Sequence, residues 1–540
     1  MNLSGKLYDA IIVGGGHNGL VAANYLSRSG LSTLTIEARD ELGGCASRIE
    51  YFPGFFGSLS NSPGSLEPSI VADLDLANHG LKFDKPDPSV VVPFGPDRAF
   101  IGWRDRDRSL AEIAKFSEKD AENYYPFFTF LENFAKALQV NLFEPPPSFA
   151  ELTRRAHEAG MDETFGKIFL GSVKDLLDEW FESTEVKAMI ASMATVNNFA
   201  GPSTPGTPFR LLQRPFSMFS SAIQAEHDPR QQILRGSTGL PRGGMGAIGV
   251  SLAKSLRASG GEIITGSRVV HIDVSKGVVR GVSTDNGQVF RASVVLSNLN
   301  AKTTLLDLID ESNLEPDFRQ KVRKKELKGS AFKVGLALNG IPRFGFATND
   351  EEARIFSSSQ FRIAPTMHYI EQSVTDVRAG RCADNPLIWG LIPSLTDPSM
   401  APEGHHVMSL NIFHVPYELV DSNWEDEKVK YGDHCIDVLT HYIPNLKDII
   451  VDRRYWSPLD LEKEFGLTGG NITHGDMLPN NMFDLRGPAG WTDYRMPIHG
   501  LYLCGSAAWP GGLVTGLPGH NASQAVLSDL RKSLKVPAST

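Results

Sequence analysis

The fold is decided by the stretch Tyr8-Asp-Ala-Ile-Ile-Val-Gly14-Gly-Gly16-His-Asn-Gly19-Leu20 near the start of the chain. Residues 9–13 form a short apolar run with β-branched side chains, which predicts a buried parallel strand. Three glycines follow in the spacing G-x-G-x-x-G, and apolar residues then recur at helical spacing. The stretch therefore predicts the order strand, glycine turn, helix.

Each glycine has a separate function in this order. Gly14 allows the tight turn, Gly16 lets the backbone approach a pyrophosphate, and Gly19 lets the helix pack closely on the strand. The N-terminus of the helix offers free N–H groups and a partial positive charge to the phosphates. A second apolar run ends at Glu37, about 20 residues further on, where a carboxylate accepts hydrogen bonds from an adenosine ribose. With Gly43-Gly44 close behind, these parts predict dinucleotide binding rather than a plain glycine-rich turn.

Composition limits the class of protein. The chain has 540 residues, too many for one hydrophobic core, so we expect two or more folded units. Hydrophobic residues make up 41% and charged residues 21%, as in ordinary globular proteins, and the net charge of -10 argues against general nucleic-acid binding. The four cysteines are far apart and form no C-x-x-C, which excludes a disulfide-reductase pair and a conventional zinc site. We therefore expect no metal.

The sequence also bears on where the protein works. The first strand begins within ten residues of Met1, which leaves no room ahead of it for a signal or transit peptide. No apolar run approaches the roughly 18 residues that a membrane-spanning helix needs. We expect a cytoplasmic protein, either free or peripherally attached to a membrane.

The middle of the chain changes character several times. Helical spacing dominates residues 109–138, where Phe127, Phe130, Leu131, Phe134 and Leu138 form a stripe that we interpret as core rather than pocket lining. Residues 216–223 are apolar and are expected to line or cover a substrate cavity. The glycines of residues 240–247 have no preceding strand, so they predict a turn at a helix N-terminus facing the active site rather than a second nucleotide loop. Short strands then predict a β-meander up to residue 296.

The chain closes on a second strand–loop–helix unit. Residues 501–503 form a short strand, and a glycine-rich loop leads to a helix that begins near Pro518. We expect Gly505-Ser506 and the backbone amides near Thr515-Gly516 to hold the other end of an extended dinucleotide.

Together these blocks resemble the phytoene desaturase-like FAD-dependent oxidoreductases, within the larger group of glutathione-reductase-type and amine-oxidase-type flavoproteins. The resemblance spans nearly the whole chain. Besides the first glycine turn and Glu37 with Gly43-Gly44, it rests on residues 241–247, 397–399 and 501–512. Gly16-His17-Asn18-Gly19 is typical of the branch with carotenoid ketolases of the phytoene-desaturase type and mitochondrial pyridine-nucleotide-disulphide-oxidoreductase-like proteins.

The resemblance implies an α/β fold, in which a glutathione-reductase/amine-oxidase-type FAD-binding Rossmann domain carries an inserted α+β substrate domain. The expected FAD domain comprises residues 1–62, 237–305 with the β-meander, and 456–540. The expected substrate domain comprises residues 63–236, mainly helical, and 306–455. FAD is expected to bind non-covalently. Its expected contacts are Gly14, Gly16, His17, Asn18, Gly19, Glu37, Ala38, Arg39, Gly43, Gly44, Cys45, Ala46, Val269, Val270, Gly505, Ser506, Leu513, Val514, Thr515 and Gly516.

The resemblance also implies oxidation of C–H bonds by hydride transfer to flavin N5, in a lipophilic isoprenoid or in a small cyclic or carbonyl substrate. His474 and Asp476 are candidates for proton transfer, although a structural role is equally open for both. Arg242 is a candidate to bind a substrate oxygen or the flavin. No second strand–glycine–helix unit for a nicotinamide dinucleotide is present, so oxygen or a quinone is the expected electron acceptor.

Two alternatives stay open. One is a flavin-dependent isomerase, in which the flavin cycles without net redox change. The other is a non-enzymatic lipid or prenyl carrier, because Rab escort and GDP-dissociation-inhibitor proteins use a related fold. The complete set of FAD motifs favours the oxidoreductase. These motifs determine neither the substrate nor the oligomeric state.

Overall fold

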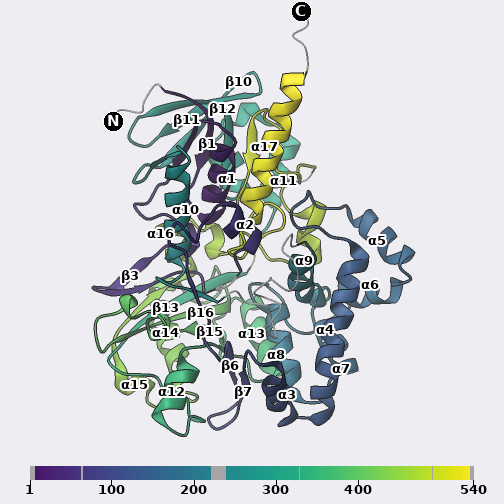
Figure 1. The fold of residues 1–540 in the computed structure, drawn as a ribbon, viewed down its shortest axis with the longest axis vertical. Coiled ribbons are helices and arrows are strands. Elements are labelled where there is room, and N and C mark those ends of the chain that lie inside the picture. The colour runs from purple at the N-terminus through teal and green to yellow at the C-terminus, as the bar shows by residue number, and fades with distance from the viewer. Residues whose placement is uncertain (1–5, 62–64, 221–238, 328, 489, 536–540) are drawn as a thin grey trace, which may run out of the picture.

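The computed structural model describes residues 6–61, 65–220, 239–327, 329–488 and 490–535. Two seven-stranded sheets organise these residues (Figure 1). The first sheet has the order β10-β11-β12-β1-β2-β9, with β18 also paired to β12, and lies in the upper half of the view. The second sheet, with the order β17-β13-β16-β15-β14-β6-β7, lies below it.

The first sheet gathers strands from distant parts of the chain. Its parallel strands are β1 (Leu7–Val13), β2 (Thr33–Ile36), β9 (Glu262–Ile264), β12 (Val289–Ser297) and β18 (Leu501–Leu503). Strands β10 (Val269–Ser275) and β11 (Val278–Thr284) form an antiparallel ladder with the start of β12. The predicted meander is present, and it ends in the long strand β12. The first part of β12 pairs with β11 and the last part with β18. The expected Rossmann-type α/β fold is confirmed.

Three helices pack side by side in this half of the molecule. Helix α1 (His17–Arg28) contacts both α10 (Gly246–Ala258) and α17 (Leu517–Lys535). The glycines before and inside α10 serve close packing, since a Cβ on Gly249 would lie 2.9 Å from the Cα of Gly43. The two-residue strand β8 (Leu240–Pro241) precedes them, but it pairs with β5 (Phe83–Asp84) outside the first sheet.

The second sheet is mostly antiparallel, and only its pairing of β14 with β6 is parallel. Its strands are β6 (Val90–Pro93), β7 (Ala99–Gly102), β13 (Ser330–Leu338), β14 (Gln360–Ile363), β15 (Leu387–Leu391), β16 (His406–Val415) and β17 (Ile450–Trp456). Helices α12 (Asp350–Ser357), α14 (Trp424–Thr440) and α15 (Leu446–Ile449) supply apolar side chains to the core of this half. The hairpin of β3 (Ile49–Phe52) and β4 (Phe55–Gly57) belongs to a smaller cluster beside it.

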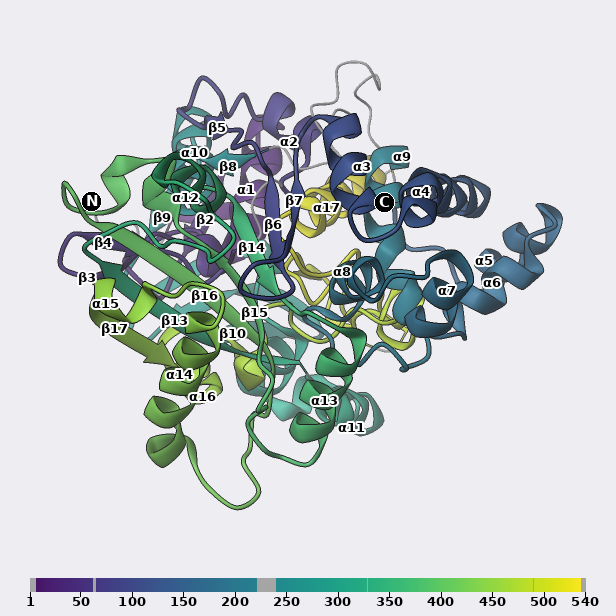
Figure 2. The same cartoon turned by 90° about the horizontal axis from the view of Figure 1, so that it is seen from below.

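A helical arm projects from one side of the molecule, as Figures 1 and 2 show from two directions. It comprises α3 (Arg106–Ala114), α4 (Glu118–Leu138), α5 (Phe149–Glu158), α6 (Asp162–Phe169), α7 (Val173–Trp180), α8 (Thr184–Thr195) and α9 (Gln213–Ser220). Helices α4, α5, α7 and α8 each follow a serine whose side chain accepts a hydrogen bond from the third residue of the helix, which fixes where they begin. The remaining helices are α2 (Pro68–Asp73), α11 (Pro316–Lys324), α13 (Met367–Arg378) and α16 (Pro458–Phe465).

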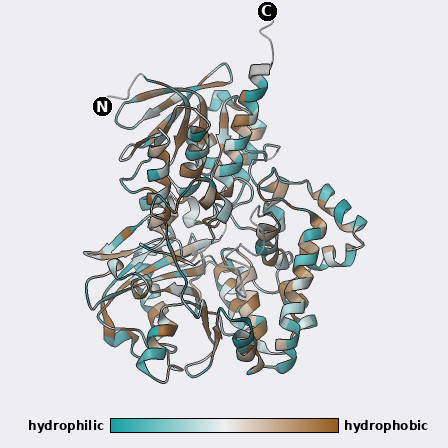
Figure 3. Ribbon diagram, in the orientation of Figure 1, coloured by the Kyte–Doolittle hydropathy of each residue, from teal (hydrophilic) through white to brown (hydrophobic). Residues whose placement is uncertain are grey.

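The apolar stripe of α4 is core, as the sequence indicates. Phe127, Leu131, Phe134 and Leu138 are fully buried, and Phe130 packs against the ring of Trp180. The other helices of the arm also carry both apolar and polar residues (Figure 3). Within the described ranges, no helix combines the length and apolar composition that crossing a membrane requires.

Candidate active site

The glycine turn between β1 and α1 leaves almost no space for side chains. Gly14 has a φ of +98°, a conformation that favours glycine. A Cβ on Gly19 would lie 2.3 Å from the carbonyl oxygen of Gly14. Helix α1 begins after Gly16 without a side-chain cap, so its first N–H groups are available to an anion.

Glu37 is held beside this turn at the end of β2. Its Oε2 accepts a hydrogen bond from the N–H of Gly15 at 2.7 Å, and its Oε1 accepts one from the N–H of Arg39 at 3.0 Å. Each carboxylate oxygen keeps further acceptor capacity, which suits the hydroxyl groups of a ribose.

A cavity of about 670 Å³, which we call the cofactor cavity, extends from this turn to the loop before α17. Its size lies within the range of small-molecule and cofactor sites, roughly 300–1,000 Å³. Predicted cofactor residues that line it are Gly14, Gly16, His17, Asn18, Glu37, Ala38, Arg39, Gly44, Cys45, Val269, Val270, Ser506, Leu513 and Val514. Burial raises the pKa of the Cys45 thiol to about 11, so Cys45 is a small neutral lining residue at neutral pH.

The other predicted cofactor residues lie behind this lining. Gly19 and Gly43 permit close backbone packing, and Ala46 is fully buried. A Cβ on Gly505 would lie 2.5 Å from the carbonyl oxygen of Asn298, and one on Gly516 would press on Ile70. These residues shape the cavity from outside it. Thr515 lines a second, neighbouring cavity instead.

Several buried polar atoms at the cofactor cavity have no hydrogen-bond partner among the described residues. They are Nε2 of His17, Oδ1 of Asn18, Nδ1 of His474 and Oδ1 of Asn197. Buried polar groups are satisfied in most native proteins, so a cluster of open ones indicates a polar ligand. Together with the glycine turn and the Glu37 carboxylate, these atoms fit an extended dinucleotide such as FAD.

Sequence reasoning missed part of the lining. Ser60, Asn197, Asn298, Lys302 and Thr473 also line the cofactor cavity. Asn298 had a usable signal, because it follows β12 at the carboxyl edge of the parallel strands, where ligands bind in α/β sheets. Ser60, Asn197 and Thr473 lie in loops, and Lys302 lies in a helical turn. The approach of these segments to the cavity depends on the tertiary fold.

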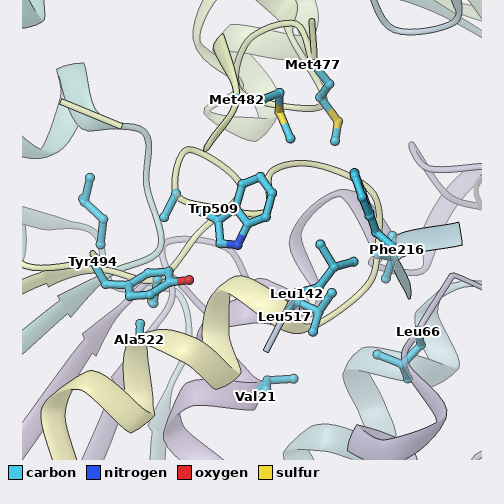
Figure 4. Close-up of a cluster of buried hydrophobic side chains, with 14 of the residues drawn as sticks. Val21, Leu66, Leu142, Phe216, Met477, Met482, Tyr494, Trp509, Leu517 and Ala522 are labelled. Carbon is cyan, nitrogen blue, oxygen red and sulfur yellow. The ribbon is translucent and has the colours of Figure 1, made fainter. Parts of the chain in front are cut away.

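The second cavity, of about 530 Å³, lies between the helical arm and the second sheet, and we call it the substrate cavity. It shares Asn197 and Leu513 with the cofactor cavity, so the two adjoin. Its walls carry many apolar and aromatic side chains, including Phe128, Leu142, Phe209, Phe216, Trp389, Phe413, Met477, Met482, Trp509 and Leu517. Several of these surround the indole ring of Trp509 (Figure 4). Of the apolar stretch 216–223, Phe216, Ser217 and Met218 line the cavity, and residues 221–223 lie outside the described residues.

His474 is the one predicted proton-transfer residue that lines a cavity, namely the cofactor cavity. Burial lowers the pKa of its imidazole to about 4, and nearby Arg486 and His17 act in the same direction. His474 is therefore uncharged at neutral pH. Its unpartnered Nδ1 can accept or donate one hydrogen bond, depending on the tautomer.

Asp476 lies near His474 but lines neither of these cavities. Its backbone oxygen accepts hydrogen bonds from Asn481 Nδ2 and Arg486 Nη1, both at 2.7 Å. Arg486 is 1% exposed and also donates to the carbonyl oxygens of Thr473 and Ser506. This arginine fixes the loop of His474 against the loop of Ser506, and it had no sequence signal.

The structure corrects the prediction for Arg242. Its side chain is 58% exposed and forms an ion pair with Asp84 at 2.5 Å. It lines neither the cofactor cavity nor the substrate cavity. The reason is that β8 pairs with β5, which turns this segment away from both cavities.

Lys333 on β13 is a buried amine that sequence reasoning also missed. It is 2% exposed, and its Nζ contacts Ser409 Oγ at 2.7 Å, Asn411 Oδ1 at 2.6 Å and Asn61 Oδ1 at 3.3 Å. Burial holds the pKa of Lys333 well below its usual range. Because Asn61 and Asn411 line the substrate cavity, Lys333 positions two polar side chains of its wall.

The fold and the paired cavities define an FAD-dependent oxidoreductase. Residues 12–63 match the model of the NAD(P)-binding Rossmann-like domain, and residues 203–527 match that of the flavin containing amine oxidoreductases. The chain belongs to this flavin containing amine oxidoreductase family, which confirms the expected cofactor, FAD, and the resemblance seen in the sequence.

Relatives extend over almost the whole chain. Pyridine nucleotide-disulfide oxidoreductase domain-containing protein 2 of Rattus norvegicus is 32% identical, with 97% of this chain and 94% of that protein covered. A limonene dehydrogenase subunit of Castellaniella defragrans is 25% identical over 97% of this chain and 95% of its own length. Among solved structures, putrescine oxidase bound to putrescine has a TM-score of 0.61 at 16% identity, covering 98% of this chain and 99% of that one. This last likeness shows the fold alone.

Proposed function

We propose that the protein desaturates or oxidises a lipophilic substrate, either an isoprenoid or a cyclic or carbonyl compound, and passes the electrons to oxygen or a quinone. The observation that carries the proposal is the junction of the two cavities at Asn197 and Leu513. A site for a redox cofactor opens there into a space with largely apolar walls. Two relatives support this proposal by their names, which denote a dehydrogenase and a desaturase. They are the limonene dehydrogenase subunit and a lycopene-forming phytoene desaturase of Pantoea ananas, which is 24% identical.

When bound, FAD would supply a two-electron acceptor for the hydride, and the proton lost from the neighbouring carbon would pass to a base of the protein. The chain supplies position and surroundings. The aromatic walls exclude water from the apolar body of the substrate, and Arg486 holds the loop that carries His474. The neutral imidazole of His474 is the proposed proton acceptor, since its Nδ1 is open and the residue lines the cofactor cavity.

The architecture of the second sheet supports the proposed electron acceptor. Nicotinamide dinucleotides bind at parallel βαβ units, whereas this sheet is mostly antiparallel. We place the reaction in the cytoplasm, because the four cysteines are free thiols in the structure and such thiols persist in a reducing compartment.

Anaerobic reduction of the holoenzyme tests this function. Isoprenoids and cyclic ketones are added to the oxygen-free protein, and the absorbance of oxidised flavin is followed. We expect a member of this panel to bleach the flavin, and oxygen or a quinone to restore the colour.

A companion assay separates the alternatives. Prolycopene isomerase 1 of an Oncidium hybrid is 24% identical, so isomerisation requires its own assay with pre-reduced protein. Product formation that requires reduced flavin without net electron transfer would identify an isomerase. A protein that binds these lipids without bleaching or isomerising them would be a carrier.

A further inference from the structure

Arg210 lies in the 3-10 turn Thr207–Leu212 that leads into α9, and it lines the substrate cavity. Arg210 is buried, with 8% of the residue exposed. A guanidinium is always charged and strongly hydrated in water, so burying one is unfavourable unless a partner compensates for the lost hydration. The identity of that partner is therefore a question about the cavity.

Among the residues that the structure describes, Arg210 has only a neutral partner. Nη1 of Arg210 donates a hydrogen bond to Oε1 of Gln213, and Nε is buried without any partner. Among the described residues, no carboxylate forms an ion pair with Arg210. The edge of the guanidinium formed by Nε and Nη2, which binds carboxylates in a bidentate manner, is therefore left to a ligand.

The charge persists at working pH. Burial lowers the pKa of Arg210 to about 10, and the nearby Arg486 acts in the same direction. Both guanidinium groups remain protonated at neutral pH. The inner wall of the cavity is therefore positive.

The remaining charges around the cavity are also positive on balance. Its lining includes four arginines and two glutamates. One of the glutamates, Glu67, is 1% exposed and accepts a hydrogen bond from Ser217 Oγ at 2.6 Å. The excess of arginines would repel a cationic amine, whereas an anion would compensate the buried charge of Arg210.

We propose that the substrate cavity binds an amphipathic carboxylic acid, whose carboxylate pairs with the Nε–Nη2 edge of Arg210 and whose apolar body lies against Phe209, Phe216 and Trp509. This inference rests on the proposed function, because it names the substrate class of the same cavity. The guanidinium fixes the polar end of the molecule and leaves the hydrocarbon to the aromatic walls.

Binding of a matched pair of probes tests the inference. Dodecanoate and methyl dodecanoate share the hydrocarbon chain and differ in charge, and dodecylamine carries the opposite charge. Each is titrated into the FAD-loaded protein below its aggregation concentration, and the fluorescence of Trp389 and Trp509, which line the cavity, reports binding. We expect the acid to bind at least tenfold more tightly than the ester, and the amine more weakly than both.

Variants identify the residue responsible. Arg210→Gln is expected to abolish the preference for the acid and to keep the affinity for the ester within about twofold, while Arg210→Lys keeps part of the preference. Arg242→Gln, at an exposed arginine outside the cavity, is the matched control and should behave like the unaltered protein. Flavin absorbance and circular dichroism establish that each variant is folded. If Arg210→Gln does not fold, the ratio of the affinities for acid and ester, compared between the unaltered protein and Arg210→Lys, still tests the inference.

Equal binding of acid and ester by the unaltered protein would overturn the inference, as would a full acid preference in Arg210→Gln. The proposed function fails separately. If acid binding depends on Arg210 but no compound bleaches the flavin or is isomerised, the anion site stands and the oxidoreductase proposal falls. If neutral isoprenoids bleach the flavin and the acid has no advantage, the proposed function stands and this inference falls.

Discussion

The cofactor cavity and the substrate cavity adjoin, yet backbone shapes the first and side chains shape the second. The cofactor cavity depends on backbone: glycine turns, a helix N-terminus and the ends of parallel strands. The substrate cavity depends on side chains that α4, the turn before α9, the second sheet and the loop before α17 each contribute. Its polar wall is held by Lys333, and its inner charge is Arg210.

This difference has a physical origin. Backbone geometry at a turn is fixed by local conformational preferences, so a few glycines at set spacing specify it. A side-chain pocket forms only when distant segments pack together, and each segment can satisfy its own local preferences in many other ways. Mutations should therefore act differently on the two cavities.

The largest effect is expected for Gly19→Ala in the glycine turn. The new Cβ would lie 2.3 Å from the carbonyl oxygen of Gly14, and backbone cannot move aside cheaply. We expect the purified protein to lose FAD and to be destabilised by roughly 2–3 kcal/mol. Flavin absorbance and thermal unfolding measure both effects.

Gly166→Ala is the matched control, because a Cβ at this position in α6 meets nothing within 4 Å. It should retain FAD and gain up to about 1 kcal/mol from helix propensity. Retention of normal flavin content by Gly19→Ala would contradict the role of close backbone packing.

The next effect concerns His474, the proposed proton acceptor at the cofactor cavity. His474→Gln removes the imidazole but keeps a polar side chain, so FAD content should be unchanged. If His474 accepts the proton, flavin reduction should slow by roughly 100-fold. Stopped-flow reduction with a substrate found in the anaerobic screen gives the rate, and an unchanged rate would reduce His474 to a structural residue.

A smaller effect concerns His414, on the strand that also carries the cavity residues Asn411 and Phe413. His414 on β16 is 2% exposed, and burial lowers the pKa of its imidazole to about 4. The unfolded chain therefore binds a proton near pH 6.5 that the folded chain does not bind until about pH 4, so His414 makes the protein less stable as the pH falls through this window. Between about pH 6.5 and about pH 5 this loss amounts to about 1.6 kcal/mol.

His414→Gln should remove that part of the pH dependence, as urea unfolding at the two pH values would show. His157→Gln, at a side chain that is 77% exposed, is the control. An equal loss of stability in His414→Gln and in the unaltered protein would show that other groups dominate acid unfolding.

The smallest effect is expected for Arg242→Gln. The side chain is exposed and paired with Asp84, and surface ion pairs contribute about 0–1 kcal/mol. Flavin content and reduction rate should stay within about twofold of the unaltered protein. A large loss of rate would restore the role that the sequence alone suggested for this arginine.

The sequence by itself determined the Rossmann-type fold, the glycine turn, Glu37 and the cofactor, because these depend on spacing within short segments. It also indicated that the α4 stripe is core. Tertiary structure alone decided which residues meet at the substrate cavity. Arg210 lies 276 residues before Arg486 in the chain, yet the field of one guanidinium reaches the other. Lys333 has no sequence motif around it. Arg242 lies next to glycines that resemble a binding motif, although it lies outside both cavities. Long-range packing creates a buried charge and its surroundings, so no local pattern can predict them.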